Sequence, residues 1–191
     1  MVIEAFAVFF TLLCVWLTTK RHILSWPIGL IGVALYSIVF WNSKLYSDFG
    51  LQFIFFAQGI FGMFHWLKYR EDKVHTKIEY MTPIQRIFWG MTGMWAYLVI
   101  AFIMYFYTDA SAPWIDSFVA VFSLIANWLL AKRKIETWNI WILVDVIYIG
   151  LFIFKELYLS AGLYAVLLIL AIKGLLDWRK SYIKSNYAYL F

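Results

Sequence analysis

Seven apolar runs divide the sequence, and each is long enough to cross a bilayer. They lie near residues 2–19, 26–43, 49–67, 84–107, 114–131, 138–155 and 160–178. A helix rises about 1.5 Å per residue, so about 20 apolar residues cover a hydrocarbon core roughly 30 Å thick. The hydrophobic content of 64% is also far above that of an ordinary soluble domain. We therefore predict an all-α membrane protein with seven transmembrane helices.

The sequence argues against several functional classes. The first run is expected to be a transmembrane helix rather than a cleaved signal peptide, because it lacks a basic start and a small-residue cleavage site. A single cysteine, Cys14, excludes an intrachain disulfide and a cysteine-based zinc site. No GxxxxGK[ST] motif occurs, so this chain is not expected to hydrolyse ATP. The three histidines form no HExxH motif, and we predict no enzyme activity and no metal or cofactor.

Basic residues are concentrated on one side of the predicted bundle. The connections that follow the first, third, fifth and seventh runs carry 13 lysines and arginines, whereas the opposite side carries only Lys44 and Lys155. Cytoplasmic connections are enriched in Lys and Arg. We therefore predict an outside N-terminus and a cytoplasmic C-terminus. The net charge of +5 reflects this orientation better than it reflects binding to nucleic acid.

The sequence contains an internal repeat. Residues 9–68 align without a gap with residues 121–180, and about 19 of the 60 aligned pairs are identical. Identical pairs include Trp16 with Trp128, Trp26 with Trp138, Gly62 with Gly174, and Trp66 with Trp178. The repeat predicts a parallel 3+1+3 arrangement, with a first repeat at 1–68, a loop and linker helix at 69–113, and a second repeat with the tail at 114–191. Transporters often bind substrate between such halves, although the repeat could also be only a trace of how the bundle arose.

A carboxylate lies in the middle of the sixth apolar run. Asp145 follows Trp138 and Trp141 and precedes Tyr148 at spacings of three, four and three, so the four side chains share one helix face. A buried charge costs at least about 3 kcal/mol on insertion scales, which makes such residues functional candidates. Aromatic faces and a carboxylate suit a flat organic cation. In the alternative interpretation, Trp138 is an interfacial residue and Asp145 pairs with a lysine.

Lys173 is the obvious partner for that carboxylate. It falls in the inner half of the seventh run, where it could reach the cytoplasmic surface, neutralise Asp145 or contact a ligand. Of these roles, pairing or surface exposure is favoured over ligand contact.

Amides and a hydroxyl form further candidate binding positions. Ser123 and Asn127 lie on one face of the fifth run, together with Asp116. Gln52 and Gln58 lie on the third run, where six residues separate them by about 120°, so at most one points squarely at a shared cavity. We favour Gln58, which is nearer mid-span. The alternative is that these amides only hold helices together.

The polar candidates are not repeated across the 112-residue offset. Asn127 aligns with Val15, Asp145 with Val33, Lys173 with Phe61, and Gln58 with Leu170. A symmetric scaffold with an asymmetric polar lining is expected if one asymmetric solute sits between the halves.

Two stretches resemble the bacterial nicotinamide riboside transporters of the PnuC type. One is LQFIFFAQGIFGMFHW at 51–66, and the other is WIDSFVAVFSLIANWLLAKRKIETWNIWILVDVIYI at 114–149. The resemblance implies a seven-helix fold like that of full-length SWEET sugar transporters, a homotrimer in the bacterial inner membrane, and facilitated uptake of a vitamin that is trapped by cytoplasmic phosphorylation. Asp145 stands where some members have Asn, Lys173 where some have Asn or an apolar residue, and Met63 where Trp is common.

These departures leave the vitamin open. Nicotinamide riboside and thiamine both carry an aromatic cation, and related members carry thiamine or riboflavin. The leading interpretation is a facilitator of nicotinamide riboside. A thiamine transporter and a substrate-binding subunit that needs an energising partner are the alternatives.

Overall fold

A computed structural model describes residues 2–42, 46–68, 77–107, 112–154, 156 and 158–187. These residues form seven helices, α1 (Val2–Thr19), α2 (Ser25–Asn42), α3 (Tyr46–Lys68), α4 (Pro83–Tyr107), α5 (Pro113–Ala131), α6 (Glu136–Phe154) and α7 (Tyr158–Tyr187). All seven are long and apolar enough to span a membrane. The prediction of an all-α protein with seven transmembrane helices is confirmed.

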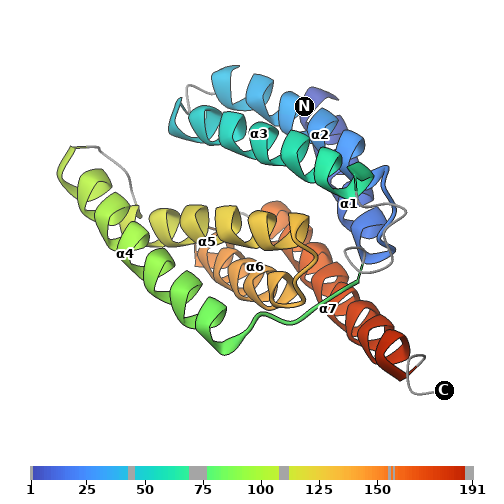
Figure 1. The fold of residues 1–191 in the computed structure, drawn as a ribbon. Coiled ribbons are helices and arrows are strands. Elements are labelled where there is room, and N and C mark those ends of the chain that lie inside the picture. The colour runs from blue at the N-terminus through green and yellow to red at the C-terminus, as the bar shows by residue number, and fades with distance from the viewer. Residues whose placement is uncertain are drawn as a thin grey trace.

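Local sequence explains where several helices begin. Thr82 and Gln85 cap the start of α4 reciprocally, because the Gln85 N–H donates to Thr82 Oγ1 and the Thr82 N–H donates to Gln85 Oε1. Pro83 and Pro113 occupy first-turn positions in α4 and α5, where a missing N–H costs no hydrogen bond. Only α7 differs much from its predicted span, since it continues to Tyr187 and projects beyond the other helices (Figure 1).

The helices form two groups of three, with α4 at the side. Within the first group α2 contacts α1 and α3, and within the second α6 contacts α5 and α7. The groups meet along two seams, α3 against α5 and α1 against α7, while α4 packs on α5 (Figure 1). The third helix of each group therefore lies against the first helix of the other.

The turns after α1 and α5 have the same backbone conformation. Arg21 and Arg133, which are 112 residues apart, have φ values of 57° and 55°, in the left-handed region that few residues other than glycine adopt. The Arg21 N–H donates to the carbonyl of Thr18, and the Arg133 N–H donates to the carbonyl of Leu130, each over 2.9 Å. Identical Lys-Arg pairs in the sequence thus occupy equivalent strained turns.

A tryptophan pair packs in the same way within each group. The rings of Trp26 and Trp66 lie 5.5 Å apart at 81°, and those of Trp138 and Trp178 lie 5.5 Å apart at 85°. A Cβ at Gly174 would stand 2.6 Å from the ring of Trp138. The glycine is therefore required so that α6 can approach α7 this closely.

The Gly174→Ala variant should unfold at a lower temperature than wild type. Its added methyl group forces the buried indole of Trp138 to move, and overpacking of this kind costs about 1–3 kcal/mol. Gly162→Ala, on the same helix, is the matched control, because nothing lies within 4 Å of a Cβ there. Thermal unfolding in detergent measures both variants. Equal destabilisation by the two would contradict this account of the packing.

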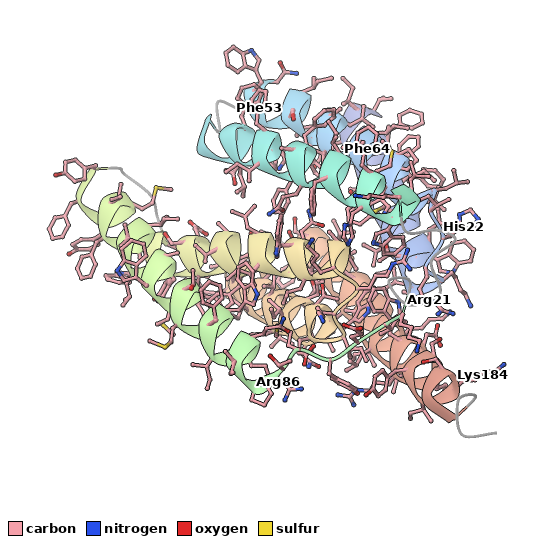
Figure 2. All side chains as sticks on the ribbon, viewed as in Figure 1. Arg21, His22, Phe53, Phe64, Arg86 and Lys184 are labelled. Atoms are coloured by element: carbon pink, nitrogen blue, oxygen red, sulfur yellow. The ribbon has the colours of Figure 1, made fainter. Side chains whose placement is uncertain are left out.

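Basic side chains gather toward one end of the bundle. In Figure 2, Arg21, Arg86 and Lys184 lie along the lower and right side, and Phe53 lies at the top. We refer to the end with the α1–α2 and α5–α6 turns as the basic end.

Candidate functional site

The α3–α5 seam contains a hydrogen-bonded pair of amides. Asn127 Nδ2 donates to Gln58 Oε1 over 3.1 Å, and Gln58 Nε2 donates to the carbonyl of Leu124 over 3.2 Å. Both amide side chains are half-buried. Each amide has two donor hydrogens and an acceptor oxygen, so the pair retains capacity for a ligand. The structure thus brings together two of the predicted site residues.

Two other polar candidates lie on the same helices. Ser123 is one turn before Asn127 on α5 and is buried, with 6% of its surface exposed. Gln52 lies six residues before Gln58 on α3 and is half-buried. Gln58 makes the contact with Asn127, and this contact fits both the ligand-binding role and the alternative that the amides hold helices together.

The face of α6 that carries Trp138, Trp141, Asp145 and Tyr148, which we call the α6 stripe, has two buried and two half-buried residues. Trp138 and Asp145 are only 2% and 3% exposed, whereas Trp141 and Tyr148 are half-buried. The Trp138 ring packs on α7 against Trp178, and its Nε1–H has no hydrogen-bond partner among the described residues. Trp138 is therefore a core residue of the second helix group as well as a member of the stripe.

Asp145 does not form the pair with Lys173 that the alternative interpretation requires. No ion pair joins the two side chains, although both belong to the described part of the chain, and Lys173 is exposed on α7. A carboxylate so deeply buried in an apolar helix requires a compensating charge or a hydrogen bond. The structure therefore favours surface exposure for Lys173 over a static pair.

Tyr148 ends the stripe in an aromatic cluster between α6 and α7. Its ring centroid lies 4.4 Å from that of Tyr164 and 5.5 Å from that of Phe152, onto which it stacks. Tyr36 stacks on Phe40 in α2 with the same spacing and a centroid distance of 5.6 Å. The α6 stripe thus runs from a tryptophan cluster at the basic end to a tyrosine cluster at the other.

The basic-end half of the α3–α5 seam is lined by stacked rings. Phe61 stacks on Trp128 at 4.8 Å and 10°, and on His65 at 5.6 Å and 18°. Lys132 Nζ lies 5.0 Å from the centroid of Phe61 and 5.4 Å from that of Trp128. These distances suit cation–π attraction.

Two indoles connect the helix groups at the basic end. Trp66 Nε1 donates to the carbonyl of Ala131 over 3.1 Å, and Trp178 Nε1 donates to the carbonyl of Thr18 over 3.3 Å. The Arg133 guanidinium lies 4.6 Å from the Trp66 ring. Burial, and then the charge of Arg21, lowers the pKa of Arg133 to about 10, which still leaves it charged at neutral pH.

The two indole hydrogen bonds that join the helix groups at the basic end were not predicted from the sequence. Trp66 and Trp178 were noticed as a repeated pair but not as contacts between the halves. Sequence reasoning also missed Glu136, a mostly buried carboxylate that binds Arg86 and the N–H of Met81. The available signal was the presence of apolar residues, among them Ile78 and Met81, in a mostly polar linker.

Comparison with known proteins identifies the family. The model of a family described as nicotinamide mononucleotide transporter matches residues 1–180. The chain belongs to this family. The nicotinamide riboside transporter PnuC of Escherichia coli (strain K12) is 26% identical over 204 residues, which cover 94% of this chain and 85% of that protein. The nicotinamide mononucleotide transporter family thus extends over nearly the whole chain.

Two further comparisons bear on fold and solute. The riboflavin/roseoflavin transporter RibM of Streptomyces davaonensis is 22% identical over 163 residues, covering 83% of this chain and 76% of that protein. A crystal structure of the vitamin B3 transporter PnuC has a TM-score of 0.78 and 23% identity, covering 95% of this chain and 82% of that one. The structural match shows the fold. Membership of a transporter family confirms the prediction of a multi-pass membrane transporter rather than an enzyme.

Proposed function

We propose that the protein imports nicotinamide riboside by facilitated diffusion. The observation that carries this proposal is Asp145, a carboxylate buried in α6 on the same face as Trp141 and Tyr148. No lysine or arginine in the described part of the chain forms an ion pair with this carboxylate, so it can neutralise the positive ring of the ligand, and aromatic faces attract such a ring. The family model and the PnuC relatives support this choice of solute.

We place the solute between two three-helix repeats, residues 1–68 and 114–191, with 69–113 as the linker. The repeated turns and tryptophan pairs support this division. Gln58 and Asn127 would bind the ribose hydroxyls from the α3–α5 seam, with Gln52 and Ser123 farther along it. Rocking of one repeat against the other would expose the site alternately to the two sides.

The same residues leave a thiamine transporter as the second candidate. Thiamine also carries an aromatic cation, and Asp145 and Trp141 would serve it equally well. Flux into liposomes that contain only the purified chain tests both candidates and the facilitator mode. Uptake of nicotinamide riboside without ATP or partner supports the proposal. Uptake of thiamine but not of nicotinamide riboside would mean that thiamine is the transported vitamin. Binding without flux would favour a substrate-binding subunit.

The assembly and orientation follow the family resemblance and the charge distribution. We propose a homotrimer in the bacterial inner membrane with an outside N-terminus. The basic end, with the turns at Arg21 and Arg133, would then face the cytoplasm. Mass measurement of the protein in detergent tests the trimer.

A fluorescent protein that folds only in the cytoplasm should be bright when it is fused to the C-terminus. The expected result follows from 13 basic residues on one side of the bundle against two on the other. A fusion to the N-terminus is the matched control and should be dark. A dark C-terminal fusion in a folded, expressed protein would reverse the orientation.

A further inference from the structure

An extended segment crosses the basic end immediately before α4 in the sequence. Residues 77–82, which we call the strap, lie along the α5–α6 turn. The Glu79 N–H donates to the carbonyl of Arg133 over 3.2 Å, and the Ile135 N–H donates to the carbonyl of Glu79 over 3.0 Å. Lys134 Nζ lies 2.7 Å from Glu79 Oε2, in a pair whose glutamate is half exposed. These backbone contacts fix the register of the strap on the second repeat.

A mostly buried carboxylate holds the strap at its other end. Glu136 begins α6, and only 11% of its side chain is exposed. Its two oxygens accept the Met81 N–H over 3.1 Å and 3.0 Å. Oε1 also accepts Arg86 Nε over 3.0 Å and lies 2.9 Å from the second guanidinium nitrogen. Glu136 therefore joins the strap, α4 and α6 through contacts that can break and reform.

The strap also covers apolar side chains between the two repeats. Ile78 is 4% exposed and belongs to one buried cluster with Trp66 and Trp178. Those two indoles make the hydrogen bonds that connect each repeat to the first helix of the other. Tyr80 packs edge-on against Tyr182 in the extension of α7, with centroids 5.0 Å apart. The strap therefore lies over the place where the repeats must separate for a solute to leave at this end.

Only one of the two repeats can hold the strap in this way. The first repeat has Leu24 at the position that aligns with Glu136, and a leucine cannot accept the Met81 N–H. The strap is thus held on the second repeat, through the Glu136 carboxylate at one end and the Glu79 backbone hydrogen bonds at the other. Loss of the Glu136 contacts would leave only the contacts around Glu79 and the packing of Ile78 and Tyr80 to hold it.

We propose that the strap is the cytoplasmic gate of the transporter and that Glu136 is the residue that holds it closed. This rests on the proposed function for its direction of transport. Release of the Met81 N–H and Arg86 from Glu136 comes first, and the two Glu79 backbone hydrogen bonds to the α5–α6 turn then break. The strap leaves the turn, Ile78 leaves the tryptophan cluster, and a path for the solute opens. Return of the contacts closes that path.

The accessibility of Ile78 tests the gate without any substrate. In a Cys14→Ala background, Ile78→Cys places a thiol at the buried position, and its rate of reaction with a maleimide in detergent reports opening. Glu136→Gln loses the ionic contact with Arg86, so we expect at least about fivefold faster labelling. The matched control is Glu79→Gln, which removes only the half-exposed pair with Lys134 and should change the rate less than about twofold.

Equal labelling rates with and without Glu136→Gln would overturn the role of this carboxylate. Hydrogen exchange of the Met81 amide allows the same comparison without the Ile78→Cys substitution. Faster exchange in Glu136→Gln than in wild type supports the proposal, and equal exchange contradicts it.

A reversible cross-link tests whether the strap must move during transport. Glu79→Cys with Lys134→Cys, in the Cys14→Ala background, places two thiols on adjacent backbones. Oxidation should lower nicotinamide riboside flux into liposomes at least about tenfold, and reduction should restore it. Each single-cysteine variant, treated with the same oxidant, is a control. Full flux through the cross-linked protein would refute the gate. Absence of flux in wild type as well would refute the proposed function. The labelling rates would still show whether Glu136 holds the strap closed.

Discussion

The Asn127→Leu variant is expected to bind nicotinamide riboside about five- to a hundredfold more weakly than wild type, a cost of roughly 1–3 kcal/mol. Leucine is likewise branched at Cγ but neither donates nor accepts a hydrogen bond. The change removes the Asn127 amide from the proposed site and leaves Gln58 Oε1 without its 3.1 Å donor. Calorimetric titration of purified protein in detergent measures the loss.

The same experiment separates ligand binding from a purely structural role of the amides. Gln58→Leu should weaken binding by a similar factor, and the double variant should lose less than the sum, because the two side chains are hydrogen-bonded to each other. Ser37→Ala is the control, since the Ser37 hydroxyl donates to the carbonyl of Val33 within α2 and makes no other hydrogen bond to a described residue. Unchanged affinity with lower thermal stability in both amide variants would show that they only join α3 to α5.

Hydropathy predicted the helices well because the bilayer sets their length. The run predicted at 2–19 coincides with α1, and the other starts agree within three residues. The end of α7 was not predictable in this way, because the residues after Trp178 are mostly polar and extend the helix outside the apolar window. Tyr182, in that extension, packs on Tyr80 of the strap. A hydropathy window carries no information about such a tertiary contact.

The candidate site was predictable in part. Helical spacing placed Trp138, Trp141, Asp145 and Tyr148 on one face, but spacing within a helix does not say what lies opposite. Spacing therefore left open whether Asp145 pairs with Lys173, and the structure shows no such ion pair between these two described residues because the lysine is exposed on α7. The Gln58–Asn127 contact crosses 69 residues of sequence, and only the packing of α3 on α5 revealed it.

The strap escaped prediction for a related reason. Its residues have neither helical nor alternating periodicity, and its structure depends on backbone pairing with Arg133 and Ile135 far along the chain. Glu136 looked like an ordinary acidic residue at a helix start, where it suits the helix dipole. Its partners come from the linker and from α4, so its role appears only in the fold.

The Asp145→Asn variant should lose the preference for a charged ligand. Hydrogen bonds and contacts that involve a charged group contribute about 1.5–3 kcal/mol, so binding of nicotinamide riboside should weaken about ten- to a hundredfold. The reduced dihydronicotinamide riboside has nearly the same shape without the ring charge, and its affinity should change little. Trp141→Ala should weaken both ligands, because it removes stacking area. Calorimetric titration of each ligand measures the difference.

Stability separates this role from a structural one. Asp145 is 3% exposed and forms no ion pair with Lys173, so replacement by a neutral isostere removes a buried charge from the empty protein. Asp145→Asn should therefore melt at the same or a higher temperature, and Lys173→Met should neither lower the melting temperature nor alter the effect of Asp145→Asn. A lower melting temperature for Asp145→Asn that Lys173→Met restores, with equal losses for both ligands, would mean that the carboxylate serves the lysine. An unchanged or higher melting temperature, together with a loss of affinity for the charged ligand alone, would show that the carboxylate acts on the ligand. A carboxylate that does not stabilise the empty protein must contribute through what it binds.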